Sequence, residues 1–176
     1  MSANVETASV LTIRSKWEQI FLSNDPFIWP FRPEFTAGRI FYPTDGYHLT
    51  KPQFMAVMEA SKKIGENELY ISIVESDKVE FLERAWGHWS CENLSYEGYI
   101  ELPLILENTI YSKKGNWGIL ISHEMHALIS GSREFMVGLD EHYREWSNDF
   151  QSLREAWSDN QNSSWLEPMV NHVGIV

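Results

Sequence analysis

The sequence predicts an α+β fold in which an antiparallel β-meander packs against several helices, including a long C-terminal amphipathic helix. Two observations support this class. Short β-branched and aromatic runs separated by turn residues occupy the middle of the chain, and stretches with apolar residues at three- and four-residue steps flank them. Segregated strands and helices of this kind are typical of α+β domains. The 176 residues, 43% of them hydrophobic, are enough for one globular domain over residues 1–176.

The chain is expected to begin with a loose segment, a helix and an ordered loop. Residues 1–9 precede any periodic pattern, so we expect them to be loosely ordered. Apolar residues recur at helical spacing from Val10, and the polar run that starts at Ser23 favours the end of this helix. Four prolines among many aromatic residues disfavour a helix or a central strand over residues 26–47, which predicts an ordered loop packed by its own aromatic side chains.

Clear local signals define the next helix and strand. Thr50 and Gln53 have the spacing of a capping box, and Gly65 can end the apolar stripe that follows, so a helix is predicted over residues 51–64. The run over residues 69–74 is short, apolar and β-branched, which predicts a buried strand.

Between this strand and the meander, the sequence predicts a short helix and a loop. Ser76 or Asp77 can cap a helical segment over residues 78–86, whose apolar side chains share one face. Residues 89–98 are polar and aromatic, and we expect them to form a loop with a little strand.

Three strands are predicted in the central part of the chain. Residues 108–112 and 117–122 are strand-like, and the glycine in the Lys-Lys-Gly-Asn linker between them can adopt a positive φ, so they predict a β-hairpin. Residues 127–130 form a third candidate strand that Gly131 ends.

One apolar stripe predicts a single long helix that begins after Ser132. The stripe contains, at steps of four or three residues, Phe135, Leu139, Tyr143, Trp146, Phe150, Leu153 and Trp157. We interpret it as a face that packs against the sheet; a dimerising coiled coil is the alternative, which bulky aromatic residues along the seam disfavour. Residues 158–176 are expected to form a surface tail held by Trp165 and Met169.

Charge and composition narrow the function classes. A formal net charge of −11 favours a cationic partner and disfavours direct contact with nucleic acid or anionic membranes. No apolar run approaches the roughly 18 residues of a membrane span, and the first residues show no signal-peptide pattern. A single cysteine, Cys91, excludes an internal disulfide and a multi-cysteine zinc site. We therefore expect a cytoplasmic protein, monomeric or homodimeric, without a cofactor.

His123, Glu124 and His126 form the pattern closest to a catalytic motif. The histidines are three residues apart, one short of the zinc-protease arrangement on a helix. As a cross-strand pair flanking a two-residue turn they could share a metal ion, but Glu124 and Met125 suit such a turn poorly, which favours a wider loop that separates the rings. The sequence indicates no third ligand. We expect no metal here, and a small zinc-dependent hydrolase using these three residues is the alternative.

Other candidate catalytic groups have simpler interpretations. Cys91 could form a thiol dyad with a histidine, but a lone cysteine beside a tryptophan is more often a packed side chain. The carboxylate pairs, Asp140 with Glu141 and Glu92 with Glu97, are typical of a solvated acidic face. The sequence contains no Gly-x-Ser-x-Gly, phosphate-loop or Cys-x-x-Cys motif. It therefore predicts no catalytic residue, and a protein that is not an enzyme.

A recognition surface is predicted where aromatic and acidic residues are interleaved. Buried aromatic anchors supply most of the binding energy of many interfaces, and complementary charge speeds association. The expected partner-binding residues are Trp86, His88, Trp89, Glu92, Tyr96, Glu97 and Tyr99.

The segment over residues 117–132, followed by Phe135, resembles a segment found in small acidic bacterial immunity proteins of polymorphic or contact-dependent toxin systems. This resemblance implies a cytoplasmic antidote that binds one cognate toxin, often a basic nuclease, and blocks its active site or substrate path. It transfers no binding residue to this chain. The expected function is neutralisation of a cognate, basic toxin by stoichiometric protein–protein interaction, and the alternatives are the zinc-dependent hydrolase and an uncharacterised homodimeric structural protein.

Overall fold

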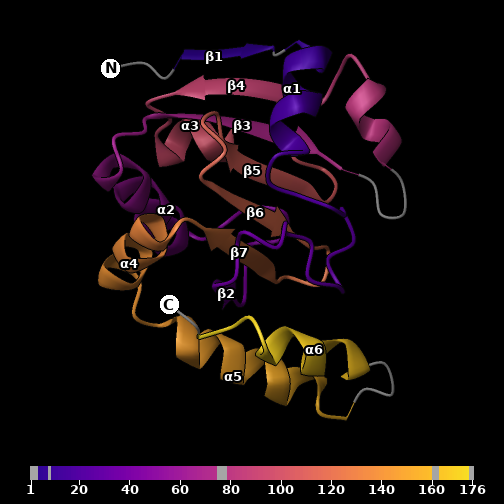
Figure 1. The fold of residues 1–176 in the computed structure, drawn as a ribbon, viewed down its shortest axis with the longest axis vertical. Coiled ribbons are helices and arrows are strands. Elements are labelled where there is room, and N and C mark those ends of the chain that lie inside the picture. Colours follow the sequence, from indigo (N-terminus) through magenta and orange to yellow (C-terminus); the bar gives the residue numbers. More distant parts are fainter. Residues whose placement is uncertain (1–3, 8, 75–78, 160–162, 175–176) are drawn as a thin grey trace.

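A computed structural model describes residues 4–7, 9–74, 79–159 and 163–174, and it confirms the α+β class. Seven strands form one sheet in the order β1-β4-β3-β5-β6-β7-β2, and each neighbouring pair is antiparallel (Figure 1). The strands are β1 (Asn4–Thr7), β2 (Gly38–Phe41), β3 (Glu68–Ile73), β4 (His88–Glu92), β5 (Asn108–Ser112), β6 (Trp117–Ile121) and β7 (Ala127–Gly131). The helices are α1 (Val10–Trp17), α2 (Lys51–Lys63), η1 (Val79–Glu83), α3 (Tyr96–Ile100), α4 (Arg133–His142), α5 (Trp146–Trp157), η2 (Ser163–Trp165) and α6 (Leu166–Val170).

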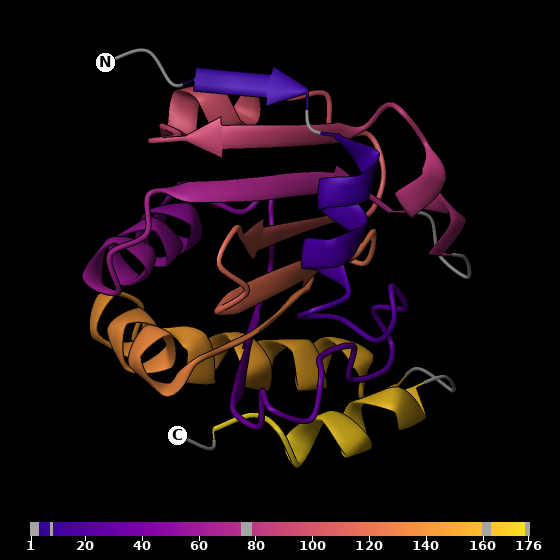
Figure 2. The same cartoon turned by 45° about the horizontal axis from the view of Figure 1, so that its top comes forward.

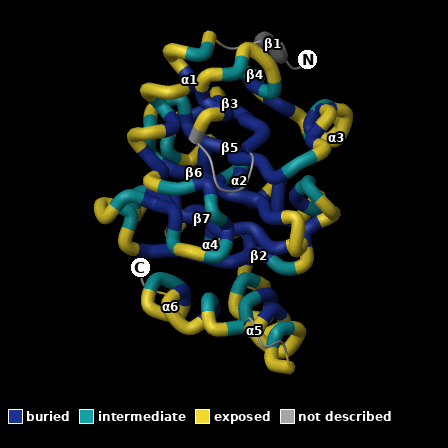
Figure 3. The backbone as a smooth tube through the Cα atoms, turned by 90° about the vertical axis from the view of Figure 1, so that its right-hand side faces the viewer, coloured by how far each residue is buried: buried dark blue, intermediate teal, exposed yellow. Residues whose placement is uncertain are grey.

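The sheet is covered on both faces. Along β3, Leu69 and Ile71 join one hydrophobic cluster and Tyr70 joins another, because successive side chains of a strand point to opposite faces. The first cluster lies under α2, α3 and α4, and the second lies under α1 and η1. Figure 3 shows α1 and α3 on opposite sides of the sheet. Because both faces are covered, every residue of β5, β6 and β7 is buried.

The predicted local signals of α2 and the meander are confirmed. Gln53 Oε1 accepts a hydrogen bond from the backbone N–H of Thr50 at 2.9 Å, which forms half of the capping box that starts α2. The β5–β6 turn contains Gly115 at φ +84°, and the register pairs Tyr111 with Gly118, as the predicted hairpin requires. These elements form where the sequence places them because their determinants lie within a few residues.

The predicted long helix is wrong: the chain forms α4 and α5 instead, separated near Tyr143 at φ −140° and ψ 89°. Phe135 and Leu139 of α4 belong to the first cluster, whereas Leu153 of α5 belongs to the second. The stripe therefore serves two different packing surfaces, and a straight helix cannot reach both. In Figures 1 and 2, α5 and α6 lie beyond the β2 edge of the sheet.

Arg39 of β2 holds this break together. Its side chain is fully buried, and its Nε and Nη2 donate to the two carboxylate oxygens of Asp140 at 2.8 and 2.6 Å. Its Nη1 donates to the Gly38 carbonyl at 2.7 Å, and the guanidinium lies 4.2 Å from the centre of the Trp146 ring. One cation thus joins β2, the last turn of α4 and the first turn of α5.

Three strands differ from the sequence-based predictions. β1 pairs with β4 in a segment expected to be loose, although residues 1–3 and 8 lie outside the described residues. β2 lies within the expected loop over residues 26–47 and pairs with β7, and β4 is an inner strand where mainly loop was expected. These short strands are specified by pairing partners distant in sequence, which local patterns do not report.

Two helical predictions are only partly correct. α1 ends at Trp17, and Ile20 and Phe21 are buried in the turn that follows rather than on a helix. The segment predicted as a helix over residues 78–86 contains the shorter η1, while Lys78 and its proposed caps, Ser76 and Asp77, lie outside the described residues.

The C-terminal segment closes the β2 edge. The Gly38 N–H donates to the His172 carbonyl at 2.8 Å, and Gly38 forms a parallel bridge with Val173. Met169 is buried and Trp165 packs against the second cluster, as expected, but on the short helices η2 and α6. Within the described part of the chain, no helix is both long and apolar enough to cross a membrane.

Candidate functional site

The structure separates the seven predicted partner-binding residues. His88 is buried, its Nδ1 2.9 Å from Ser72 Oγ and its Nε2 3.1 Å from the Phe81 carbonyl, and burial lowers its pKa. Tyr99 is also buried, and its hydroxyl accepts the N–H of Leu49 at 2.9 Å. The prediction that these two side chains contact a partner is therefore wrong, because both belong to the interior.

The other five lie in different places. Trp89 is half-buried against the first cluster. Glu92 is exposed at the end of β4, whereas Trp86 is exposed at the opposite end of that strand and stacks on Arg84 at 4.2 Å. Tyr96 and Glu97 belong to α3 and line a groove. The interleaved sequence pattern is therefore not one surface.

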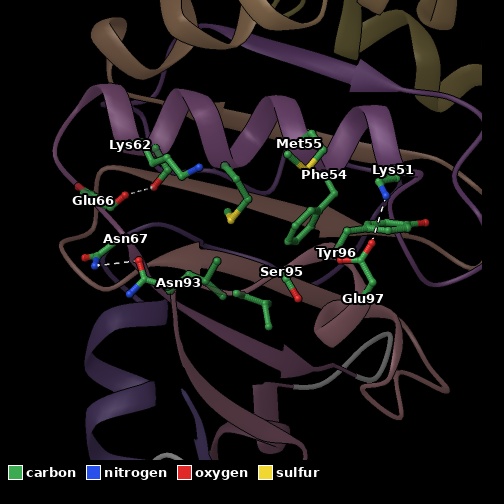
Figure 4. Close-up of a pocket in the computed structure, with 14 residues that line it drawn as sticks. Lys51, Phe54, Met55, Lys62, Glu66, Asn67, Asn93, Ser95, Tyr96 and Glu97 are labelled. Atoms are coloured by element: carbon green, nitrogen blue, oxygen red, sulfur yellow. Dashed lines mark hydrogen bonds and ion pairs between the residues drawn. The ribbon is translucent and has the colours of Figure 1, made fainter. Parts of the chain in front are cut away.

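The groove lies between α2 and the segment that joins β4 to α3 (Figure 4). It encloses about 420 Å³. Its apolar walls are formed by Phe54, Met55, Met58, Leu69, Leu94 and Tyr96. Such a lining suits an apolar segment or ligand.

The charged side chains on the groove rim are paired with one another. Lys51 Nζ lies 3.1 Å from Glu97 Oε1, and Lys62 Nζ lies 2.7 Å from Glu59 Oε1. The pKa of the Glu97 carboxyl lies below its usual value. The largest cause is a hydrogen bond from its own backbone N–H, and the hydrogen bond and charge of the Lys51 ammonium lower it further. The rim therefore presents no excess of either charge that would select an occupant.

The loop between β6 and β7 is a three-residue hairpin over His123, Glu124 and Met125. The Ser122 N–H donates to the His126 carbonyl at 2.9 Å, and Met125 adopts φ +57°, the left-handed conformation that often closes such loops. This is the wider loop that the sequence favoured over a two-residue turn.

The two histidines of this hairpin diverge. His126 is fully buried, with Nε2 3.0 Å from the Pro26 carbonyl, and burial lowers its pKa to about 4. His123 is exposed, and the Phe27 ring contacts both imidazoles, at centroid distances of 5.9 and 5.8 Å. Among the described residues, no three His, Cys, Asp or Glu side chains could hold a metal ion together. The His123, Glu124 and His126 set is therefore not arranged as the zinc alternative requires.

His123 instead covers a buried carboxylate. Its Nδ1 lies 2.6 Å from Oε1 of Glu107, whose side chain is only 7% exposed. The other oxygen, Oε2, is buried without a hydrogen-bond partner. On the solvent side, the other ring nitrogen of His123, Nε2, lies 3.3 Å from Glu124 Oε1. A buried acceptor with no donor is costly and marks Glu107 for closer attention.

Five segments lie at the end of the sheet where this hairpin is found, and we call this region the hairpin end: residues 25–28, 43–48, 84–87, 105–107 and 122–126. Backbone hydrogen bonds connect three of these segments to the hairpin or to the end of β3. The Thr44 N–H donates to the Met125 carbonyl at 2.9 Å, the Val74 N–H to the Glu107 carbonyl at 2.7 Å, and the Ile73 N–H to the Gly87 carbonyl at 2.8 Å. The hairpin end thus gathers loops from the same end of strands β2 to β7.

The hairpin end combines exposed apolar side chains with carboxylates. Its exposed apolar residues are Ile28 (49%), Trp86 (53%), Ile105 (67%) and Met125 (45%). Its charged residues are the four acids Asp25, Asp45, Glu107 and Glu124 and the one base Arg84.

The opposite end of the sheet has the reverse charge balance. Residues 62–68 and 112–116 there, together with Glu92 beside Glu68, contain four lysines and three glutamates. Two of these lysines bind groups at the same end of the sheet. Lys114 Nζ donates to the Gly65 carbonyl at 3.0 Å, and Lys113 Nζ lies 2.8 Å from Glu68 Oε1. The hairpin end therefore has three more acidic than basic residues, whereas these turns at the opposite end have an excess of lysine.

The remaining candidate catalytic groups have structural roles. Cys91 is buried, and desolvation raises the pKa of its thiol to about 12. Asp140 pairs with Arg39, and Glu141 pairs with Lys63 at the α2–α4 contact. The simpler interpretation is confirmed for Cys91, which is a packed side chain, but it is wrong for Asp140, which is partly buried against Arg39 and does not belong to a solvated acidic face.

The important residues that sequence reasoning missed are Ile28, Ile105 and Glu107. Ile28 lies in one loop, Ile105 and Glu107 lie in another more than seventy positions away, and the fold places both loops at the same end of the sheet. A single apolar or acidic residue in a loop carries no local signal of this meeting. Comparison of the chain with protein families, curated proteins and solved structures finds no match.

Proposed function

We propose that this protein is a bacterial immunity protein, which acts in the cytoplasm by binding and neutralising a cognate basic toxin. The single observation that carries the proposal is the hairpin end, where four exposed apolar side chains lie among carboxylates. Exposed apolar anchors near charged groups of one sign are typical of surfaces that bind an oppositely charged protein.

Two physical effects would act in sequence. The negative field of the hairpin end, within a chain of net charge −11, would speed the encounter with a cationic surface. Burial of Trp86 and Ile105 against the partner would then slow dissociation, because truncation of buried aromatic anchors is what weakens interfaces most. Added salt should lower the association rate more than it raises the dissociation rate.

The test first searches the genes that flank the one for this chain for a secreted protein with a basic C-terminal domain, and it then uses that domain as the candidate toxin. We expect a one-to-one complex and growth of cells that produce both proteins. The association rate should decrease as the NaCl concentration is raised from 50 to 500 mM. Trp86→Ala should weaken the complex by about tenfold or more, as a central anchor does.

Leu11→Ala is the matched control, because Leu11 is 81% exposed on α1 and lies outside the hairpin end. It should bind as the wild type does. Absence of a complex and of growth rescue would refute the proposed function. Equal losses from Trp86→Ala and Leu11→Ala would refute the placement of the surface.

A further inference from the structure

We propose that Glu107 is the anchor for one arginine of the partner, and that His123 is its displaceable cover. This inference rests on the proposed function, since it names the partner group that the hairpin end receives. It would convert a broadly acidic surface into one with a specific point of attachment.

The first observation is the state of the Glu107 carboxylate. Its side chain is 93% buried, and its Oε1 accepts hydrogen bonds from His123 Nδ1 and, at 3.4 Å, from the His123 backbone N–H, while Oε2 has no hydrogen-bond partner. A buried carboxylate normally has both oxygens satisfied, because an unpaired acceptor loses its hydration without replacement. The free protein therefore holds an acceptor that one further donor would stabilise.

The second observation is the nature of the cover. His123 projects from a hairpin loop, and its imidazole is 46% exposed. One imidazole nitrogen can satisfy only one carboxylate oxygen in this geometry. An exposed side chain on a loop can rotate into solvent at lower cost than a side chain packed within the sheet.

The chemistry of the unsatisfied pair selects arginine. A guanidinium presents two parallel N–H groups that match the two oxygens of a carboxylate, whereas an ammonium acts as a point charge. Arginine that replaced the imidazole would keep Oε1 satisfied and supply the donor that Oε2 lacks. The Phe27 ring, which already contacts His123, would offer the guanidinium an aromatic face.

The surroundings favour a cation at this point. Glu124 Oε1 lies 3.3 Å from His123 Nε2, so a second carboxylate flanks the cover on its solvent side. Met125 and Ile105 are exposed two positions from His123 and Glu107, respectively, and can pack on the aliphatic part of an arginine side chain. Arg84, the one basic residue of the hairpin end, is bound to the Ile73 carbonyl and stacked on Trp86.

The probe is N-acetyl-arginine amide, followed through the Met125 methyl and His123 ring resonances by NMR at constant ionic strength. We expect saturable shifts that N-acetyl-lysine amide and sodium chloride do not reproduce. Glu107→Gln should weaken binding of the probe about tenfold or more, because it removes a charge-assisted hydrogen-bonded pair. The matched control Glu124→Gln changes an exposed carboxylate of the same loop and should have a smaller effect.

His123→Ala provides a test that leaves the carboxylate intact. If the imidazole is a cover, its removal should tighten binding of the arginine probe. Unchanged or weaker binding by His123→Ala, or retention of wild-type affinity by Glu107→Gln, would overturn the inference. Circular dichroism spectra and thermal melts of each variant establish that the fold is retained, and the His123→Ala result decides the matter if Glu107→Gln fails to fold.

Measurement on the partner complex separates this inference from the proposed function. A complex that forms equally well with wild type and Glu107→Gln overturns the arginine anchor and leaves the immunity function standing. No complex with any candidate toxin, together with specific binding of the arginine probe, removes the immunity function and leaves the arginine site. The two claims therefore fail independently.

Discussion

Lowering the pH should destabilise this protein, with the largest contribution from His126. Its imidazole is fully buried between the hairpin and the C-terminal helices, and it stacks on Trp165 with ring centroids 4.9 Å apart. Nε2 lies 3.0 Å from the Pro26 carbonyl, and Nδ1 is buried without a hydrogen-bond partner. A protonated imidazole would place a charge in this apolar site, which is why desolvation lowers its pKa to about 4.

The sign and size of the effect follow from the pKa difference between the folded and unfolded chains. Below pH 6.5, the unfolded chain binds a proton at His126 that the folded chain rejects, so stability is complete above that pH and falls as the pH drops towards 4. A difference of 2.5 pKa units, from 6.5 to about 4, corresponds to about 3 kcal/mol of unfolding free energy at pH 4. This is a large part of the stability of a typical domain.

Urea denaturation between pH 4 and pH 8 measures this directly. His126→Gln keeps an N–H donor for the Pro26 carbonyl but does not titrate, so its loss of stability on acidification should be smaller than that of the wild type by about 3 kcal/mol. The lowered pKa of His88 contributes to both proteins and cancels in the difference. Parallel pH profiles for wild type and His126→Gln would refute the reasoning.

Two further predictions concern buried groups. Arg39→Met should lower the free energy of unfolding by about 3 kcal/mol or more, because it leaves the Asp140 carboxylate without its cation. As a control, Arg14→Met removes a half-exposed surface pair and should change the free energy of unfolding by less than about 1 kcal/mol. Similar losses in both variants would contradict this account. Cys91 should react with a disulfide reagent far more slowly in the native protein than in urea, because its raised pKa and burial leave little accessible thiolate; equal rates would contradict the buried placement.

Local sequence signals determine the part of the fold that could be predicted. Thr50 and Gln53 start α2 through contacts within one turn, and Gly115 closes a hairpin between adjacent strands. The stripe from Phe135 to Trp157 has a faultless helical period, yet the chain bends because its two halves pack on different surfaces. Periodicity reports that a residue is buried, and it does not report which surface buries it.

The candidate site was less predictable for a related reason. Their proximity in the sequence predicts that Trp86, His88 and Tyr99 share a surface. In the structure Trp86 is exposed, whereas His88 on β4 and Tyr99 on α3 point into the core. Glu107 became a candidate site residue only in the structure, where the β6–β7 loop places His123 over its carboxylate. Such a meeting depends on strand register, which is a property of the whole sheet.

The placement of α5 and α6 after all seven strands has a consequence for synthesis on the ribosome. Every strand emerges before the segment that binds Gly38 and covers the β2 edge, so the nascent sheet passes through a stage in which that edge is open to pairing with other chains. A premature stop codon within α5 would leave this stage permanent. Late nonsense mutations should therefore be as damaging to the yield of active protein as early ones.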